Sequence, residues 1–124
     1  MNGKHTSFTD IPLTTRGEQM ARLLGRSLAG KNFSLVLVSP RQRAGRTCEL
    51  AGFSSQAELC SDLSEWNYGE YEGRTTTEIR KDVPGWTIWN GQPPGGESAS
   101  DVQERCRRVI DRARSMTRLS LIHI

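Results

Sequence analysis

The stretch that decides the fold is Leu35-Val36-Leu37-Val38-Ser39-Pro40-Arg41-Gln42-Arg43-Ala44-Gly45-Arg46-Thr47. Its first four residues are leucine or valine, and an uncharged run of this kind is typical of a strand buried on both faces. Ser39 is a favourable N-cap and Pro40 suits the first helical position, so we expect a helix from Pro40 to about Ala51. The stretch therefore predicts a buried strand, a sharp turn and the N-terminus of a helix.

The start of this expected helix is a candidate anion site. A helix N-terminus presents free backbone N–H groups and the positive end of the helix dipole, and Arg41, Arg43 and Arg46 add positive charge. In an open α/β sheet, ligands bind beyond the carboxyl ends of the strands, where this turn is expected to lie. We take Arg43 as the best candidate for a phosphate ligand. The alternative is a solvated helix start, and in either case we expect Arg41 and Arg46 to be surface residues.

Helices and strands alternate along the first half of the chain. A helix is predicted over about residues 15–29, begun by a capping box of Thr15 and Glu18 and ended by Gly30. Apolar residues recur in it at helical spacing and are expected to face inward: Met20, Leu23, Leu24 and Leu28. A short strand is expected near residues 58–60. This alternation predicts βαβ units, a parallel sheet and an α/β fold.

The second half of the chain is expected to contain an insertion, a long helix and a tail. Thr75 with Glu78 can start a short helix, and Trp86 and Trp89, at helical spacing, are expected to pack as a lid-like insertion. The last strong helix is predicted over residues 101–114, with Ser100 as its cap. Its expected inner face is Val102, Cys106, Val109, Ile110 and Ala113. Residues 119–124 form either a final strand or a frayed end.

Composition limits the classes of function. A chain of 124 residues is long enough for one domain with a real core. Its net charge is +3, and its basic residues share the expected helices with acidic ones, which argues against a nucleic-acid partner. A small basic RNA- or DNA-binding domain stays a competing hypothesis because the pI is near 9.0. Three widely spaced cysteines lack metal or redox spacing, so we expect reduced thiols and a cytoplasmic protein. No apolar run is long enough to cross a membrane, and no membrane partner is expected.

A second segment, Leu63 to Gly73, is dense in carboxylates and aromatic residues. We select Glu65 as a general acid because it follows an expected strand and stands beside Trp66. A partly apolar wall would raise the pKa of such a carboxyl group, which suits proton donation. The alternative is a solvated loop that Tyr68 and Tyr71 anchor.

Four pieces of the sequence, in this order, resemble the histidine phosphatase superfamily, whose members are phosphoglycerate-mutase-like. They are His5 to Glu18, Ser39 to Ala44, Glu65 to Gly73, and Pro94 to Ser98. The loop together with residues 86–89 is most similar to the branch of small sugar-phosphate phosphatases, which includes sedoheptulose-bisphosphatase-like enzymes. The resemblance implies a three-layer α/β/α sandwich with a mostly parallel sheet, here without the first strand of the family.

The resemblance also implies a mechanism. In the family, a histidine in an Arg-His-Gly motif attacks phosphorus, a second histidine and two arginines hold the phosphoryl oxygens, and a carboxylic acid protonates the leaving alcohol. Carried over by position, Arg43 corresponds to a phosphate-binding arginine and Glu65 to the proton donor. Thr6 and Ser7 correspond to a loop that contacts substrate. The implied ligand is a small phosphorylated metabolite, and neither a metal nor another cofactor is implied.

The sequence departs from the family at both histidines. His5 is not part of an Arg-His-Gly motif, since Lys4 precedes it and Thr6 follows it, so we expect a surface loop histidine. The family's second histidine lies in Ser-His-Gly, whereas His123 is followed by Ile124. We therefore expect residues 1–124 to form a single, incomplete domain that is inactive and associates through an unpaired sheet edge. The open alternatives are a non-catalytic phosphate-binding domain and a phosphoglycerate mutase.

Overall fold

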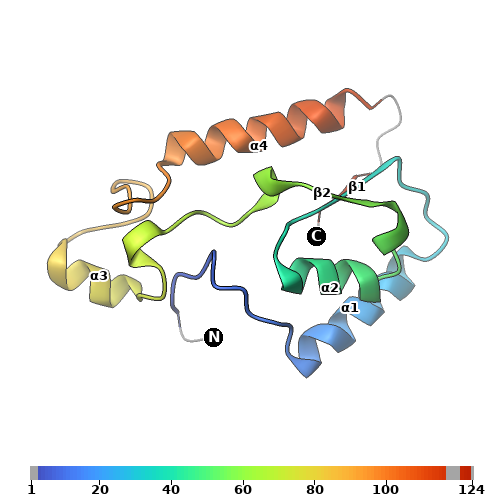
Figure 1. Ribbon diagram of the computed structural model, residues 1–124, viewed down its shortest axis with the longest axis horizontal. Helices are drawn as coiled ribbons and strands as arrows, with labels where there is room; N and C mark the ends of the chain where they lie inside the picture. The colour runs from blue at the N-terminus through green and yellow to red at the C-terminus, as the bar shows by residue number, and fades with distance from the viewer. Residues whose placement is uncertain (1–2, 117–120, 124) are drawn as a thin grey trace. The chain divides into compact units, whose positions relative to one another are not determined.

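The computed structural model describes residues 3–116 and 121–123, the last three by their backbone alone. Figure 1 shows the helices and strands coloured in chain order. The chain divides into two compact units. Unit 1 comprises the described residues up to Thr9 together with Glu65–Cys106, and unit 2 comprises Asp10–Ser64 with the described residues from Arg107 on. That residues 1–124 form a single domain stays a prediction.

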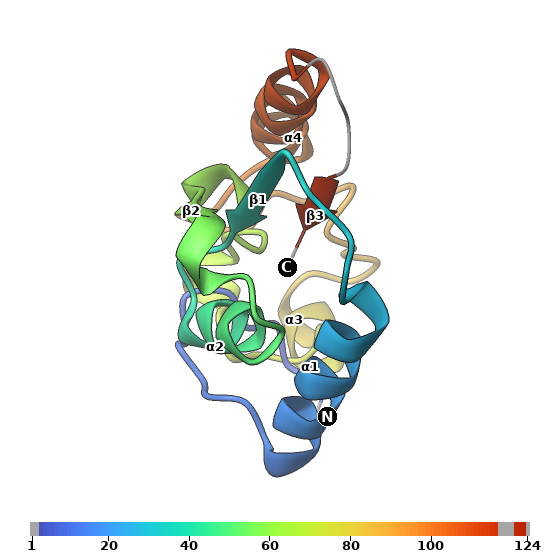
Figure 2. The ribbon, with the colours of Figure 1, turned by 90° about the vertical axis from the view of Figure 1, so that its right-hand side faces the viewer.

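Unit 2 contains a parallel sheet of three strands in the order β2-β1-β3 (Figure 2). The strands are β1 (Leu35–Val38), β2 (Ala57–Leu59) and β3 (Leu121–His123). All four residues of the central strand β1 are buried, as a run of leucine and valine requires. The α/β class and the parallel sheet are thus confirmed, and β3 shows that the tail includes a strand.

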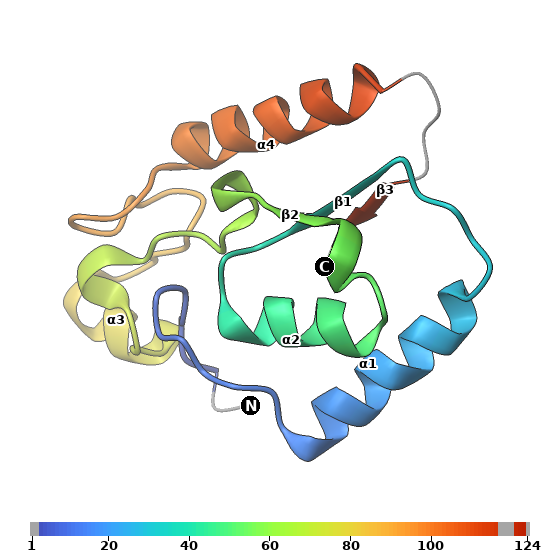
Figure 3. The same ribbon diagram turned by 45° about the vertical axis from the view of Figure 1, so that its right-hand side comes forward.

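Helices cover the sheet of unit 2 on both faces. Helices α1 (Thr15–Leu28) and α2 (Gln42–Leu50) lie side by side on one face, and the part of α4 (Ala99–Arg114) from Arg107 on lies on the other (Figures 2 and 3). At Gly25 in α1, a Cβ atom would stand 2.8 Å from the carbonyl oxygen of Ala51, so the absence of a side chain permits this close approach. The core beneath α2 consists of Val36, Val38, Cys48, Ala51 and Phe53.

The boundaries of α1 were predicted well and its inner face was not. Its N-cap is Thr14, whose hydroxyl accepts from the Gly17 N–H at 3.1 Å, rather than Thr15 in a capping box with Glu18. The one buried residue of the helix is Ala21. Three residues that were expected to face inward are instead 57%, 49% and 38% exposed: Met20, Leu23 and Leu24.

Unit 1 is built around the short helix α3 (Thr76–Asp82). The predicted capping box of Thr75 and Glu78 is confirmed, with both hydrogen bonds present. Ile79 of this helix is fully buried in a cluster with Tyr71 and Trp86. The expected packing of both insertion tryptophans is half right, since Trp86 is 3% exposed and Trp89 is 77% exposed.

Helix α4 starts earlier than predicted, and the side of it that is buried differs from the expected one. Its cap is Ser98, whose hydroxyl accepts from the Asp101 N–H while the Asp101 carboxylate accepts from the Ser98 N–H. The expected inner face is wrong in part, because Cys106 and Ile110 are exposed whereas Arg105 is 8% exposed. Three turns of 3₁₀ helix complete the described elements: Ser54–Gln56, Ser61–Leu63 and Gly69–Tyr71. No helix among the described residues has the length and apolar character needed to span a bilayer.

Candidate functional site

Arg43 is the second residue of α2 and follows the carboxyl end of β1, as predicted. The helix begins at Gln42 and has Arg41 as its N-cap residue, so the prediction that Ser39 caps it is wrong. The chain uses residues 39–41 for the turn, and Ser39 is buried at the strand end. Arg43 is half-buried. The backbone carbonyl oxygen of Arg43 accepts from the Thr47 hydroxyl at 2.8 Å.

A carboxylate from an earlier segment caps this helix. The Asp10 Oδ1 atom accepts from the backbone N–H of Gln42 at 2.9 Å, and the Gln42 side-chain amide donates to the Asp10 carbonyl. A negative group at a helix N-terminus is favourable, so Asp10 stabilises the start of α2. Because Asp10 occupies the Gln42 N–H, attraction for an anion at this end rests on the guanidinium of Arg43 rather than on that backbone donor.

Arg46 has a different role from Arg43. Its Nε atom lies 2.9 Å from Glu18 and its Nη1 atom 2.9 Å from Glu49, and the side chain is 41% exposed. This confirms the expectation that Arg46 is a surface residue. It also makes Arg46 a useful control for Arg43 on the same helix.

Glu65, the candidate acid, is the first residue of its loop in unit 1. Its Oε1 atom accepts from the backbone N–H of Trp66 at 2.9 Å, and the Tyr68 hydroxyl lies 3.5 Å from the same oxygen. Trp66 is buried, whereas Glu65 is exposed, so the apolar wall that we expected around this carboxyl group is absent among the described residues. The carboxylate is instead oriented by two donors of its own loop.

Tyr68 is coupled to this carboxylate. Burial, and then the charge of Glu65 and the hydrogen bond to it, raise the pKa of Tyr68 to about 12, with a smaller contribution from Glu72. The phenol therefore remains protonated at neutral pH and can donate to Glu65.

The Thr6–Ser7 segment joins the same loop. Ser7 is fully buried; its hydroxyl donates to the Glu65 carbonyl at 3.0 Å and its N–H to Glu72 Oε1 at 2.7 Å. The same Glu72 oxygen accepts from the N–H and the hydroxyl of Thr9. Thr6 is half-buried. Ser7 thus holds the Glu65 loop in place, and the expectation that both residues contact a substrate stays a prediction.

His5 is not the plain surface group that we expected. Its Nε2 atom lies 3.0 Å from the Thr76 hydroxyl, and its ring centroid is 4.8 Å from Tyr68 and 5.5 Å from Trp86. The neighbouring backbone is tied by a bond from the Gly73 N–H to the His5 carbonyl. Packing of this kind gives His5 a part in the core of unit 1. The side chain of His123 lies outside the described residues.

An ion pair between Glu97 and Arg105 in unit 1 was not predicted from the sequence. The Arg105 Nε atom lies 2.7 Å from Glu97 Oε1, and Nη2 lies 3.0 Å from Oε2. The Arg105 hydrogen bond, more than any other contact, lowers the pKa of Glu97. A signal for it exists in the sequence, because Arg105 occupies a helical position between Val102 and Val109 where an apolar residue is usual.

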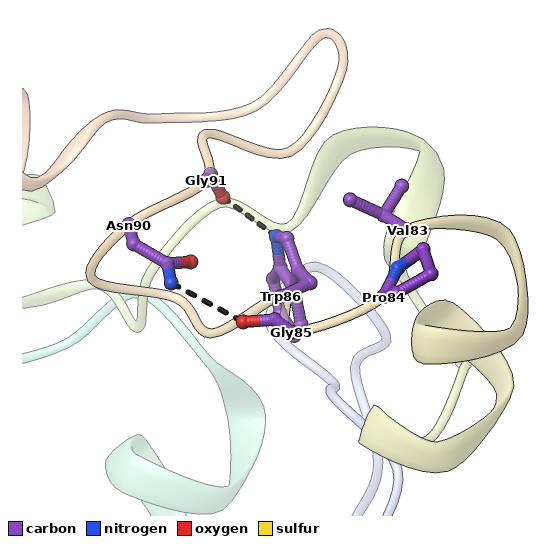
Figure 4. Close-up of a pocket in the computed structure, with 6 residues that line it drawn as sticks. All are labelled: Val83, Pro84, Gly85, Trp86, Asn90 and Gly91. Atoms are coloured by element: carbon purple, nitrogen blue, oxygen red, sulfur yellow. Dashed lines mark hydrogen bonds between the residues drawn. The ribbon is translucent and has the colours of Figure 1, made fainter.

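A shallow pocket of about 250 Å³ lies in the insertion of unit 1 (Figure 4). It is lined by Val83, Pro84, Gly85, Trp86, Asn90 and Gly91. The Trp86 Nε1–H donates to the Gly91 carbonyl at 2.7 Å and the Asn90 amide donates to the Gly85 carbonyl at 3.2 Å. The pocket has no charged lining residue, so it does not fit a phosphate. Among residues 3–116, no group of three or more His, Cys, Asp or Glu side chains is placed to hold a metal ion.

Comparison with known proteins identifies the class. Residues 1–121 match the sequence profile of the histidine phosphatase superfamily (branch 1), and the chain belongs to this family. An acid phosphatase of Mycobacterium tuberculosis is 39% identical over 110 residues, which cover 87% of this chain and 54% of the relative. A sedoheptulose 1,7-bisphosphatase of Saccharomyces cerevisiae is 32% identical over 141 residues, which cover 94% of this chain and 52% of the relative.

Solved structures agree with this assignment. The structure of open reading frame Rv3214 from Mycobacterium tuberculosis matches with a TM-score of 0.87 at 34% identity, covering 98% of this chain and 64% of that one. The α-ribazole phosphatase of Shigella flexneri matches with a TM-score of 0.81 at 27% identity, covering 99% and 65%. The chain spans about half the length of the curated relatives it matches. Arg43 belongs to unit 2 and Glu65 to unit 1, so their meeting in one cleft stays a prediction.

Proposed function

We propose that the chain supplies the phosphate-binding arginine and the proton donor of a phosphomonoester hydrolase. The observation that carries the proposal is the match of residues 1–121 to the histidine phosphatase superfamily, together with Arg43 in the first turn of α2 after β1. The geometry around Glu65 supports the second role, because the Trp66 N–H and the Tyr68 hydroxyl orient its carboxylate.

In the proposed reaction, the guanidinium of Arg43 balances negative charge on the phosphoryl oxygens. A histidine nitrogen forms a bond to phosphorus, the bond between phosphorus and the ester oxygen breaks, and Glu65 gives its proton to that oxygen. Water then cleaves the phosphohistidine and releases phosphate. The printed sequence contains no Arg-His-Gly tripeptide, so we propose that these 124 residues alone do not turn over.

The proposed substrates are small phosphorylated metabolites. The relatives named above include a sedoheptulose 1,7-bisphosphatase and an α-ribazole phosphatase. Both are named as phosphatases, and the two names give different substrates. We propose a cytoplasmic location because Cys48, Cys60 and Cys106 are all free thiols. Association through an edge of the three-stranded sheet remains part of the proposal, since β2 and β3 are edge strands within the described sheet.

Hydrolysis of p-nitrophenyl phosphate without added metal tests the proposal. We expect background rates from the 124-residue chain and turnover from the chain extended at its N-terminus by a strand ending in Arg-His-Gly. In the extended chain, Arg43→Ala and Glu65→Gln should each lower the rate at least about 100-fold. Two exposed neighbours are matched controls, Arg46→Gln on the same helix and Glu70→Gln in the same loop. Equal rates in Arg43→Ala and Arg46→Gln would remove Arg43 from the mechanism.

A non-catalytic phosphate-binding domain is the second candidate, favoured by a retained Arg43 in a sequence without Arg-His-Gly. Calorimetry of the 124-residue chain with inorganic phosphate and phosphosugars tests it: binding that Arg43→Ala abolishes supports it, and absence of heat rejects it. Mutase chemistry is tested in the extended chain by conversion of 3-phosphoglycerate to 2-phosphoglycerate, and nucleic-acid binding by a gel shift at physiological salt.

A further inference from the structure

Glu97 and Arg105 form the most enclosed ion pair among the described residues. The guanidinium meets the carboxylate in a two-point contact, with N–O distances of 2.7 and 3.0 Å. The side chain of Arg105 is 10% exposed and that of Glu97 is 24% exposed. A two-point contact fixes the orientation of both groups as well as their distance. The pair therefore sets where the backbone of Glu97 lies relative to α4.

The two residues that follow Glu65 are bound to Glu97. The Asn67 N–H donates to Glu97 Oε2 at 2.8 Å, and the Glu97 N–H donates to the Asn67 carbonyl at 2.9 Å. The indole N–H of Trp66 donates to the Glu97 carbonyl at 2.8 Å. Both backbone groups of Glu97 and its carboxylate thus hold the segment next to the candidate acid.

Two glycines bring the same segments into direct backbone contact. A Cβ atom at Gly69 would lie 2.2 Å from the Pro94 carbonyl oxygen, and one at Gly96 would lie 2.5 Å from the Asn67 carbonyl oxygen. The Glu70 N–H donates to the same Pro94 carbonyl at 2.9 Å. With no side chain between the two backbones, a movement of Glu97 is passed on to the loop that begins at Glu65.

We propose that Glu97 and Arg105 are positioning residues for Glu65: their ion pair holds the Trp66–Tyr68 segment so that its two donors aim the Glu65 carboxylate. The inference rests on the proposed role of Glu65 as the proton donor. Glu97 contacts this segment at three points: the Trp66 indole, the Asn67 N–H and the Asn67 carbonyl.

NMR of the 124-residue chain with ¹³C-labelled tyrosine tests the inference without turnover. The chain has two tyrosines, Tyr68 beside Glu65 and Tyr71 in the buried cluster with Ile79. The Tyr68 hydroxyl lies 3.5 Å from Glu65 Oε1, so Glu65→Gln should move the Tyr68 ring signals, and the size of this response measures how well the carboxylate is held against the phenol. Introduced together with Glu65→Gln, Glu97→Gln and Arg105→Lys should each reduce the response at least two-fold while the Tyr71 signals stay unchanged.

A matched control lies one turn further along α4. Arg108 forms a two-point pair with Asp62, and both residues belong to unit 2, so Arg108→Gln should leave the Tyr68 response unchanged. Full response in both Glu97→Gln and Arg105→Lys would overturn the inference. So would simultaneous loss of the Tyr71 signals in both, because the pair would then support the fold in general. The proposed function fails separately, if Glu65→Gln keeps full phosphatase activity in the extended chain.

Discussion

Glu97→Gln should lower the stability of unit 1 by about 3 kcal/mol. The substitution leaves the Arg105 guanidinium, a residue that is 8% exposed, without its carboxylate. Breaking a buried ion pair by removing one partner costs about 3–5 kcal/mol, and we take the lower end because the Glu97 side chain is 24% exposed. Glutamine keeps an oxygen for the Asn67 N–H, so the loss is confined to the ionic contact.

Urea unfolding followed by tryptophan fluorescence measures this change with probes that lie in unit 1. All three tryptophans lie in unit 1, at positions 66, 86 and 89. With a denaturant slope of about 1–3 kcal/mol per molar urea, the midpoint should fall by roughly 1–3 M. The control is Arg108→Gln, whose pair joins a 54% exposed arginine to a 28% exposed carboxylate and should contribute less than about 1 kcal/mol. Equal effects of the two substitutions would refute the reasoning.

The same pair predicts a pH dependence of definite sign. Arg105 lowers the pKa of Glu97 below its ordinary value of 4.5 in the folded state. A group whose folded pKa is depressed contributes stability that is present above its unfolded pKa and is lost as pH falls through the folded value. The stabilities of the wild-type chain and Glu97→Gln should therefore converge as pH falls below 4.5. A constant difference across that range would contradict the assignment.

Three further outcomes are expected. Gly25→Ala should destabilise the chain by about 1–3 kcal/mol, because the new Cβ atom would lie 2.8 Å from the carbonyl oxygen of Ala51; thermal unfolding followed by circular dichroism measures the change. The control Gly45→Ala, whose new Cβ atom has nothing within 4 Å, should be neutral or stabilising. Because the pKa of Tyr68 is raised to about 12, the wild-type chain should lose stability as pH rises from 10 to 12, and Tyr68→Phe should lose less. Equal losses would be evidence against the raised pKa of this half-buried phenol. A thiol reagent should modify the exposed Cys106 rapidly and Cys48 only on unfolding, because Cys48 is buried and burial raises the pKa of its thiol. Rapid reaction of Cys48 in the folded chain would contradict its buried position.

Local signals in the sequence predicted local structure. The run of leucine and valine identified β1, and the Thr75–Glu78 pair identified the start of α3, because each signal acts within a few residues. The cap of α2 could not be predicted in this way. It comes from Asp10, 32 residues before Gln42, and depends on how the chain folds back on itself.

Burial was predicted less well than secondary structure. The spacing of Met20, Leu23 and Leu24 correctly indicated a helix, yet a pattern identifies an apolar face without showing whether a neighbour covers it. The candidate site shows the same limit. Glu65 was selected for an apolar environment that the described residues do not provide, while Arg105, an arginine in an inward helical position, was overlooked.

We propose that Arg43 and Glu65 belong to one phosphate site, and a phosphate titration of the ¹⁵N-labelled chain tests this proposal most directly. Two signals report on the two residues: the side-chain Nε–H of Arg43 and the backbone N–H of Trp66, which donates to Glu65. We expect inorganic phosphate to move both signals with one dissociation constant, and we expect Arg43→Ala to abolish both responses. A response at Arg43 with none at Trp66, or two different dissociation constants, would contradict it.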